Sequence, residues 1–206
     1  MLYYKTIDTK TLELLKKLQK ISIFKNLRLV SGTALALQIG HRKSVDIDLF
    51  GVLEADIYEL SEAISQFGQV TLLNRTKNIN IYLIDGVKVD IVNYHYPWIE
   101  NPQIFDDILM AHPKDIIAMK LAAITGRGSK KDFIDLYFLL QSFLLTEMLN
   151  LYEKKYADGS VFLVLKSLSY FDDADKQELP SMLKHIRWDE VKTFINNQLD
   201  IYHKNN

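Results

Sequence analysis

The chain has 206 residues, of which 48% are hydrophobic and 25% charged, and its formal net charge is −1. These values are typical of a globular protein with a sizeable core, and they exclude a disordered chain and a uniformly basic nucleic-acid binder. The lack of cysteine excludes a disulfide framework and a thiolate zinc site and fits a reducing cytoplasm. We expect neither a signal peptide nor a membrane span, because no segment has the required apolar run.

The first half of the chain alternates predicted helices with predicted strands. Apolar spacing predicts, in chain order, helix 9–24, strand 27–30, helix 33–39, strand 45–50, helix 54–67 and strands 70–73, 79–84 and 87–94. Asp85-Gly86, between the last two strands, is a strong signal for a two-residue hairpin turn. This interleaving predicts an α/β lobe over residues 1–96.

The second half is predicted to be helical throughout. Helices are expected over residues 112–124 and 131–143, separated by the helix-breaking Gly-Arg-Gly of residues 126–128. From Thr146 onward every segment is predicted to be helical. Residues 97–206 are therefore expected to form an all-helical lobe that follows the α/β lobe.

Two aspartates one residue apart are the first candidate metal ligands. Asp46 and Asp48 lie on the predicted strand 45–50, where alternate side chains share a face. The residues that alternate with them, Val45, Ile47 and Leu49, are expected to face the core. Two neighbouring carboxylates repel each other unless a divalent cation lies between them, and magnesium suits such oxygen ligands. The alternative is an ordinary ion pair of Asp48 with Arg42 or Lys43.

A third carboxylate lies on a later predicted strand. Asp90 shares a face of strand 87–94 with Lys88, while Val89 and Ile91 face the other way. We expect a neighbouring antiparallel strand to bring Asp90 beside the first two aspartates. Three carboxylates can hold two metal ions, one activating a nucleophile and one binding phosphates.

The segment before the aspartate pair has the features of a phosphate site. Ser31 and Gly32 open a predicted helix, whose first backbone N–H groups and dipole attract anions. Gly32 allows close approach of a phosphate, Thr33 adds a hydroxyl donor, and Arg42 is a candidate triphosphate contact. The alternative is that the hydroxyl residues only cap the helix.

Several of these segments resemble a known family. The turn-helix and Asp-x-Asp pattern is similar to the nucleotidyltransferase superfamily that includes DNA polymerase β, and more closely to the AbiEii/AbiGii-type nucleotidyltransferase toxins. The segments that carry the resemblance are residues 31–37, 40–42, 44–50, Lys120-Leu121-Ala122-Ala123 with Arg127, and residues 131–137. The resemblance extends over residues 27–140, with one departure: the family usually has two glycines where this chain has Ser31-Gly32.

The resemblance implies a bilobal fold, in which an α/β (α+β) lobe with a mixed sheet flanked by helices precedes a helical lobe. It implies transfer of a nucleotide from a nucleoside triphosphate (NTP), with magnesium in a two-metal site held by Asp46, Asp48 and Asp90. Some members modify the tRNA acceptor end and are paired with a winged-helix antitoxin. These properties imply tRNA and an antitoxin as partners.

The resemblance also assigns roles in the helical half. Lys120 would contact the triphosphate, and Asp132 or Asp135 would complete the site. From the residues alone, a lysine in an apolar helix must reach water, a carboxylate or a phosphate, and both aspartates also suit helix capping and solvent.

Two other functions stay open. One is the same transfer to a protein hydroxyl or a small-molecule acceptor, and the other is a catalytically silent module that binds an antitoxin.

Overall fold

The computed structural model describes residues 1–205, which divide into two compact units. The first unit contains residues 1–95 and 102–111, and the second contains residues 96–101 and the chain from residue 112 onward. The sheet unit therefore recruits a segment that follows residue 97, where only helices are expected from the sequence.

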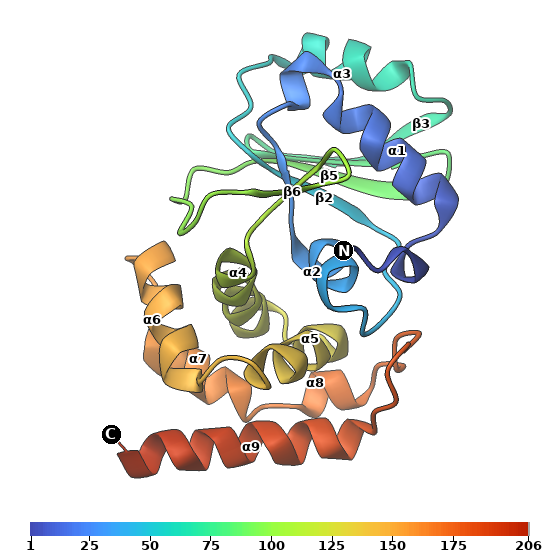
Figure 1. The fold of residues 1–206 in the computed structure, drawn as a ribbon. Coiled ribbons are helices and arrows are strands. Elements are labelled where there is room, and N and C mark those ends of the chain that lie inside the picture. Colours follow the sequence, from blue (N-terminus) through green and yellow to red (C-terminus); the bar gives the residue numbers. More distant parts are fainter. Residues whose placement is uncertain (206) are drawn as a thin grey trace. The chain divides into compact units, whose positions relative to one another are not determined.

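A mixed seven-stranded sheet forms the centre of the first unit (Figure 1). Its strands are β1 (Arg28–Leu29), β2 (Ile47–Gly51), β3 (Val70–Arg75), β4 (Ile79–Ile84), β5 (Val87–Asn93), β6 (Gln103–Phe105) and β7 (Ile108–Met110). They lie in the order β3-β4-β5-β2-β1-β7-β6. The pairs β2/β5 and β1/β7 are parallel and the other pairs antiparallel, which confirms the mixed sheet.

Three α-helices flank this sheet: α1 (Thr9–Gln19), α2 (Ser31–Ile39) and α3 (Ile57–Ser65). In Figure 1, α1 and α3 lie over one face and α2 lies on the other. Helix α1 begins where the Asp8 carboxylate accepts the Thr11 N–H, and α2 ends at Gly40, whose φ of +67° suits glycine.

The hairpin between β4 and β5 is confirmed. Asp85 and Gly86 have φ angles of +47° and +84°, as a tight primed turn requires. The hairpin β6–β7 is absent from the sequence expectations, because its turn is Asp106-Asp107 rather than a glycine-containing pair. Both aspartates adopt positive φ, which aspartate tolerates better than most residues.

The second unit is helical, as predicted. Its helices are α4 (Pro113–Gly126), α5 (Lys130–Leu140), α6 (Leu145–Lys155), α7 (Val161–Leu168), α8 (Asp172–Asp175) and α9 (Trp188–Asn205). Helix α4 packs against α5, α6 and α7. Within residues 1–205 no single helix has the length and hydropathy of a membrane span, and α5 and α6 reach it only when joined across a 118° bend.

Candidate active site

Helix α2 opens with an unusual backbone conformation. Ser31 has a φ of +62°, a left-handed value that favours glycine. At the next residue, a Cβ on Gly32 would lie 2.2 Å from the Arg42 guanidinium and 3.5 Å from the Ser44 hydroxyl. A side chain at position 32 would therefore force the Arg42 guanidinium to move. Arg42 is buried there, and its guanidinium donates to the Lys43 carbonyl at 3.0 Å.

The aspartate segment is held beside this turn by hydrogen bonds. The Val30 N–H donates to the Asp48 carbonyl at 2.9 Å, so β2 runs alongside the start of α2. The Thr33 hydroxyl donates to the Asp46 carbonyl at 2.5 Å and lies 2.8 Å from the Ser44 hydroxyl. Thr33 is only 1% exposed. The Thr33 hydroxyl thus holds the aspartate segment in place, and its contact with a phosphate stays a prediction.

The two aspartates differ from expectation in one respect. β2 begins at Ile47, so Asp46 precedes the strand instead of lying in it. Val45 is 60% exposed, and its predicted place in the core is wrong. Residues 41–46 precede β2, so the alternation of side-chain faces along the strand begins only at Ile47. Asp46 and Asp48 are both partly exposed.

The third carboxylate lies on the strand next to β2. β2 and β5 are parallel, and their register pairs Asp48 with Asp90. Our expectation of an antiparallel neighbour is wrong. Asp90 does lie beside Asp48, since paired residues of adjacent strands project to the same face, whereas the register shows no such pairing for Asp46. Val89 and Ile91 are fully buried on the other face, as predicted.

Asp90 has a basic partner on its own strand. The Lys88 ammonium lies 2.5 and 2.6 Å from the two carboxylate oxygens of Asp90, and the two side chains are 39% and 18% exposed. The sequence places both side chains on one face, but it does not show that they pair.

The carboxylate oxygens of Asp46, Asp48 and Asp90 are of the ligand type that magnesium prefers. Asp48 and Asp90 are register partners, and Asp46 is tied to the same turn through its carbonyl. In the part of the chain that the structure describes, no three His, Asp or Glu side chains are arranged to enclose a metal ion. Asp46, Asp48 and Asp90 therefore do not form such a group in this structure, and the two-metal site stays a prediction.

The helical unit holds the remaining predicted residues. The Lys120 ammonium lies 2.9 Å from Asp132 and 2.5 Å from Asp135, and all three side chains are buried. Arg127 binds Asp132 with two N–H donors at 2.8 and 3.1 Å. The lysine thus reaches carboxylates, and this cluster joins α4 to α5.

The charges of this cluster act on Asp132. Burial by itself raises the pKa of Asp132, but the Lys120 charge and the Arg127 hydrogen bond oppose it, and the pKa ends well below its ordinary value. Asp132 is therefore an anion throughout the physiological pH range. It can hold two cations in place at the start of α5.

A second buried ion pair gives no clear signal in the sequence. The Lys155 ammonium lies 2.7 Å from the Asp115 carboxylate, and both side chains are 0% exposed. Asp115 also accepts N–H groups of Ile99 and Glu100 at 2.9 and 3.1 Å, and Lys155 donates to the Pro97 carbonyl at 2.9 Å. This pair ties residues 97–100 to α4 and α6, so we assign it a structural role.

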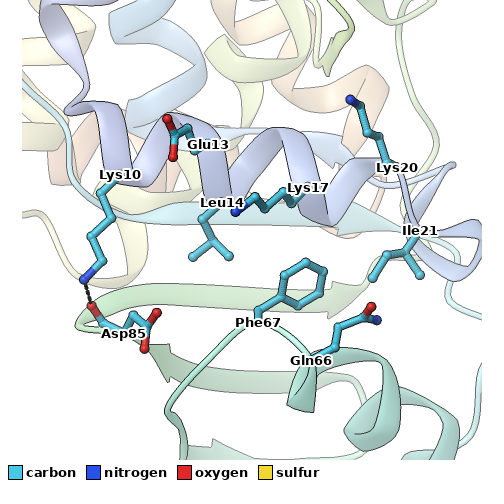
Figure 2. Close-up of a pocket in the computed structure, with 9 residues that line it drawn as sticks. All are labelled: Lys10, Glu13, Leu14, Lys17, Lys20, Ile21, Gln66, Phe67 and Asp85. Carbon is cyan, nitrogen blue, oxygen red and sulfur yellow. Dashed lines mark hydrogen bonds between the residues drawn. The ribbon is translucent and has the colours of Figure 1, made fainter.

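A cavity of about 610 Å³ lies elsewhere in the first unit, beneath α1 (Figure 2). Leu14 and Phe67 point into it from opposite sides, and Lys10 donates to the Asp85 carbonyl at one end. None of the predicted site residues is among those that line this cavity. We therefore place the candidate chemistry at the carboxylates and not here.

Comparison with known proteins gives consistent results. The family described as "Nucleotidyl transferase AbiEii toxin, Type IV TA system" matches residues 13–197. An uncharacterised protein of Aquifex aeolicus is 37% identical over 199 residues, covering 94% of this chain and 96% of the relative.

Two solved structures share the fold. JHP933 from Helicobacter pylori has a TM-score of 0.63 at 19% identity, covering 97% of this chain and 94% of that one. The nucleotidyltransferase toxin MenT4 from Mycobacterium tuberculosis has a TM-score of 0.60 at 12% identity, covering 92% and 81%.

Proposed function

The chain belongs to the nucleotidyl transferase AbiEii toxin family, and from this premise we propose that it transfers a nucleotide from an NTP to an acceptor hydroxyl. The observation that carries this proposal is the pairing of Asp48 with Asp90 in adjacent parallel strands, beside the N-terminus of α2. Carboxylates next to a helix N-terminus can serve a cation and the phosphates that accompany it.

In the proposed reaction, the acceptor oxygen attacks the α-phosphorus and forms a new P–O bond. The bond from that phosphorus to the bridging oxygen of the β-phosphate breaks, and pyrophosphate leaves with the electron pair. Asp90, whose carboxylate is paired with the Lys88 ammonium, helps to position the attacking hydroxyl or accepts its proton. Magnesium held by Asp46 and Asp48 would supply positive charge against the phosphate oxygens.

Other residues are proposed to hold the triphosphate. The first backbone N–H groups of α2, at Ser31 and Gly32, have no acceptor within the helix and suit phosphate oxygens. Arg42, packed against Gly32, adds positive charge at the same turn. For Lys120 the family resemblance supports a triphosphate contact, with Asp132 and Asp135 holding its ammonium group in place.

The acceptor and the partner follow from the family resemblance. We propose the acceptor end of tRNA as the substrate and the cytoplasm as the place of action. We also propose an antitoxin protein as the partner, because the family is that of a toxin–antitoxin system.

Transfer of label from each of the four α-labelled NTPs, with magnesium, tests this proposal. Purified protein is incubated with total cellular RNA, with cellular protein and with a small-molecule extract, and labelled products are separated by class. The wild type is compared with Asp48→Asn and with Asp200→Asn, which changes an exposed carboxylate on α9.

We expect label in tRNA with the wild type and with Asp200→Asn, and none with Asp48→Asn. Label in protein or in a small molecule would replace tRNA as the acceptor and leave the reaction unchanged. If Asp48→Asn labels its acceptor as fast as the wild type, the enzymatic proposal is wrong. A wild type that labels nothing yet binds a partner would favour the silent antitoxin-binding module.

A further inference from the structure

The cavity beneath α1, which we call the α1 cavity, is formed by three segments of the first unit that lie far apart in the sequence (Figure 2). Residues 10–21 of α1 and the chain just after it form one side, residues 66 and 67 after α3 form a second, and Asp85 in the β4–β5 turn forms a third. Its volume of about 610 Å³ lies within the range of about 300–1,000 Å³ that is usual for small-molecule sites. The α1 cavity therefore has the size for a small ligand.

Apolar side chains line part of the α1 cavity. They belong to Leu14, Ile21 and Phe67, and Figure 2 shows Leu14 and Phe67 facing each other across it. Leu14 is buried, whereas Ile21 and Phe67 are half-buried and keep apolar surface in contact with water. A ligand body between these side chains would remove that surface from water, and an aromatic body would pack on the Phe67 ring.

The charged groups of the α1 cavity are mostly lysines. Lys10 donates to the Asp85 carbonyl, and the Asp85 carboxylate accepts the Gln69 N–H at 2.8 Å. Lys17 and Lys20 are exposed, and in the described part of the chain no carboxylate is hydrogen-bonded or ion-paired to either ammonium group. These two lysines can therefore bind an anionic group without breaking an existing ion pair.

The net charge of the α1 cavity limits the charge of its ligand. Its three lysines are opposed by the carboxylates of Glu13 and Asp85, which leaves a net charge of +1. A ligand with one or two negative charges is attracted, whereas a long polyanion would also meet the two carboxylates and be repelled by them. Ammonium groups donate to carboxylate and phosphate oxygens alike.

We propose that the α1 cavity binds a small organic anion, with an apolar or aromatic body between Leu14 and Phe67 and a carboxylate or phosphate group at Lys17. Lys20, three positions further along, adds positive charge at the same side of the cavity. Such a ligand contacts α1, the end of α3 and the β4–β5 turn at once, so it stabilises their packing. The inference is independent of the proposed function, since no candidate catalytic residue lines the α1 cavity.

Two fluorescent probes with the same aromatic body test the proposal on the full chain. Anilinonaphthalene sulfonate (ANS) carries one anionic group, and phenylnaphthylamine is its uncharged counterpart. Both are titrated at physiological ionic strength, where exposed charges are screened as in the cell. The proteins are the wild type, Lys17→Met, Phe67→Ala and Lys77→Met, a matched control in the exposed β3–β4 turn. Circular dichroism verifies that each variant is folded.

We expect the wild type and Lys77→Met to bind one ANS molecule per chain, and Lys17→Met to bind it about tenfold more weakly, because a charge-assisted hydrogen bond is lost. Phenylnaphthylamine should bind these three proteins equally, and Phe67→Ala should bind both probes more weakly. A wild type that binds no ANS would overturn the proposal. Equal ANS affinities of the wild type and Lys17→Met, or of the wild type and Phe67→Ala, would overturn it as well.

A second measurement locates the bound probe. Lysine acetylation by acetic anhydride, followed by mass spectrometry, reports how accessible each ammonium group is. We expect saturating ANS to lower the reactivity of Lys17 several-fold relative to Lys77, and an unchanged reactivity would place the probe elsewhere and contradict the inference. The measurement is repeated with a single-stranded RNA oligonucleotide. If RNA protects Lys17 at lower concentration than ANS does, the α1 cavity is a nucleic-acid contact and the inference is wrong.

Discussion

Replacing Ser31 by glycine should stabilise the protein. Ser31 has a φ of +62° at the start of α2, and this left-handed conformation costs an L-residue about 1–2 kcal/mol. Glycine removes that cost, but its greater freedom in the unfolded chain takes back about 0.5–1 kcal/mol. We therefore expect Ser31→Gly to raise the free energy of unfolding by about 0.5–1 kcal/mol.

The measurement is urea unfolding followed by circular dichroism, with Ser31→Ala as the matched control. Alanine removes the hydroxyl, as glycine does, but keeps the Cβ that makes the conformation costly. The slope of the transition should stay the same in all three proteins, and only the midpoint should move. If Ser31→Ala is as stable as Ser31→Gly, the backbone conformation of residue 31 is not strained and the reasoning fails.

Two further predictions concern the buried charges of the helical unit. Asp115→Asn leaves the Lys155 ammonium buried without its anion, so we expect the free energy of unfolding in urea to fall by about 3–5 kcal/mol. Adding Lys155→Met should recover part of this loss. If it recovers none, the unpaired lysine charge is not the cause. The pKa of Asp132 is lowered in the folded state, so its stabilising effect is complete above about pH 4, the pKa of an unfolded aspartate, and is lost as the pH falls further. Wild-type stability should therefore drop more steeply below that pH than that of Asp132→Asn, and equal slopes would contradict the lowered pKa.

The sequence predicts the local parts of this protein well. Each predicted element of the first half corresponds to a helix or strand, and the Asp85-Gly86 turn has the expected geometry. These features depend on residues close in the chain, where apolar spacing and turn chemistry determine the outcome. Gly32 is different, because its lack of a side chain predicts room for the close approach of a phosphate. In the free protein, that room is taken by Arg42.

The features that the sequence does not predict depend on distant partners. Lys155 and Asp115 are 40 positions apart, and the sequence around each of them gives no sign that its charged side chain is buried. The hairpin β6–β7 joins the sheet through the parallel pairing of Leu29 with Met110, which no local pattern indicates. Its Asp106-Asp107 turn also lacks the glycine that would have marked it.

The parallel pairing of β2 and β5 has the largest consequence for function. Parallel neighbours need a long crossover, and here it contains α3, β3 and β4. It pairs Asp90 with Asp48 and leaves Lys88 one residue before the first pair of the register, Val89 with Ile47. An antiparallel pairing that kept Asp90 beside Asp48 would put Lys88 level with Phe50 instead. The chain direction of β5, rather than the presence of three aspartates, therefore decides which charges share the site.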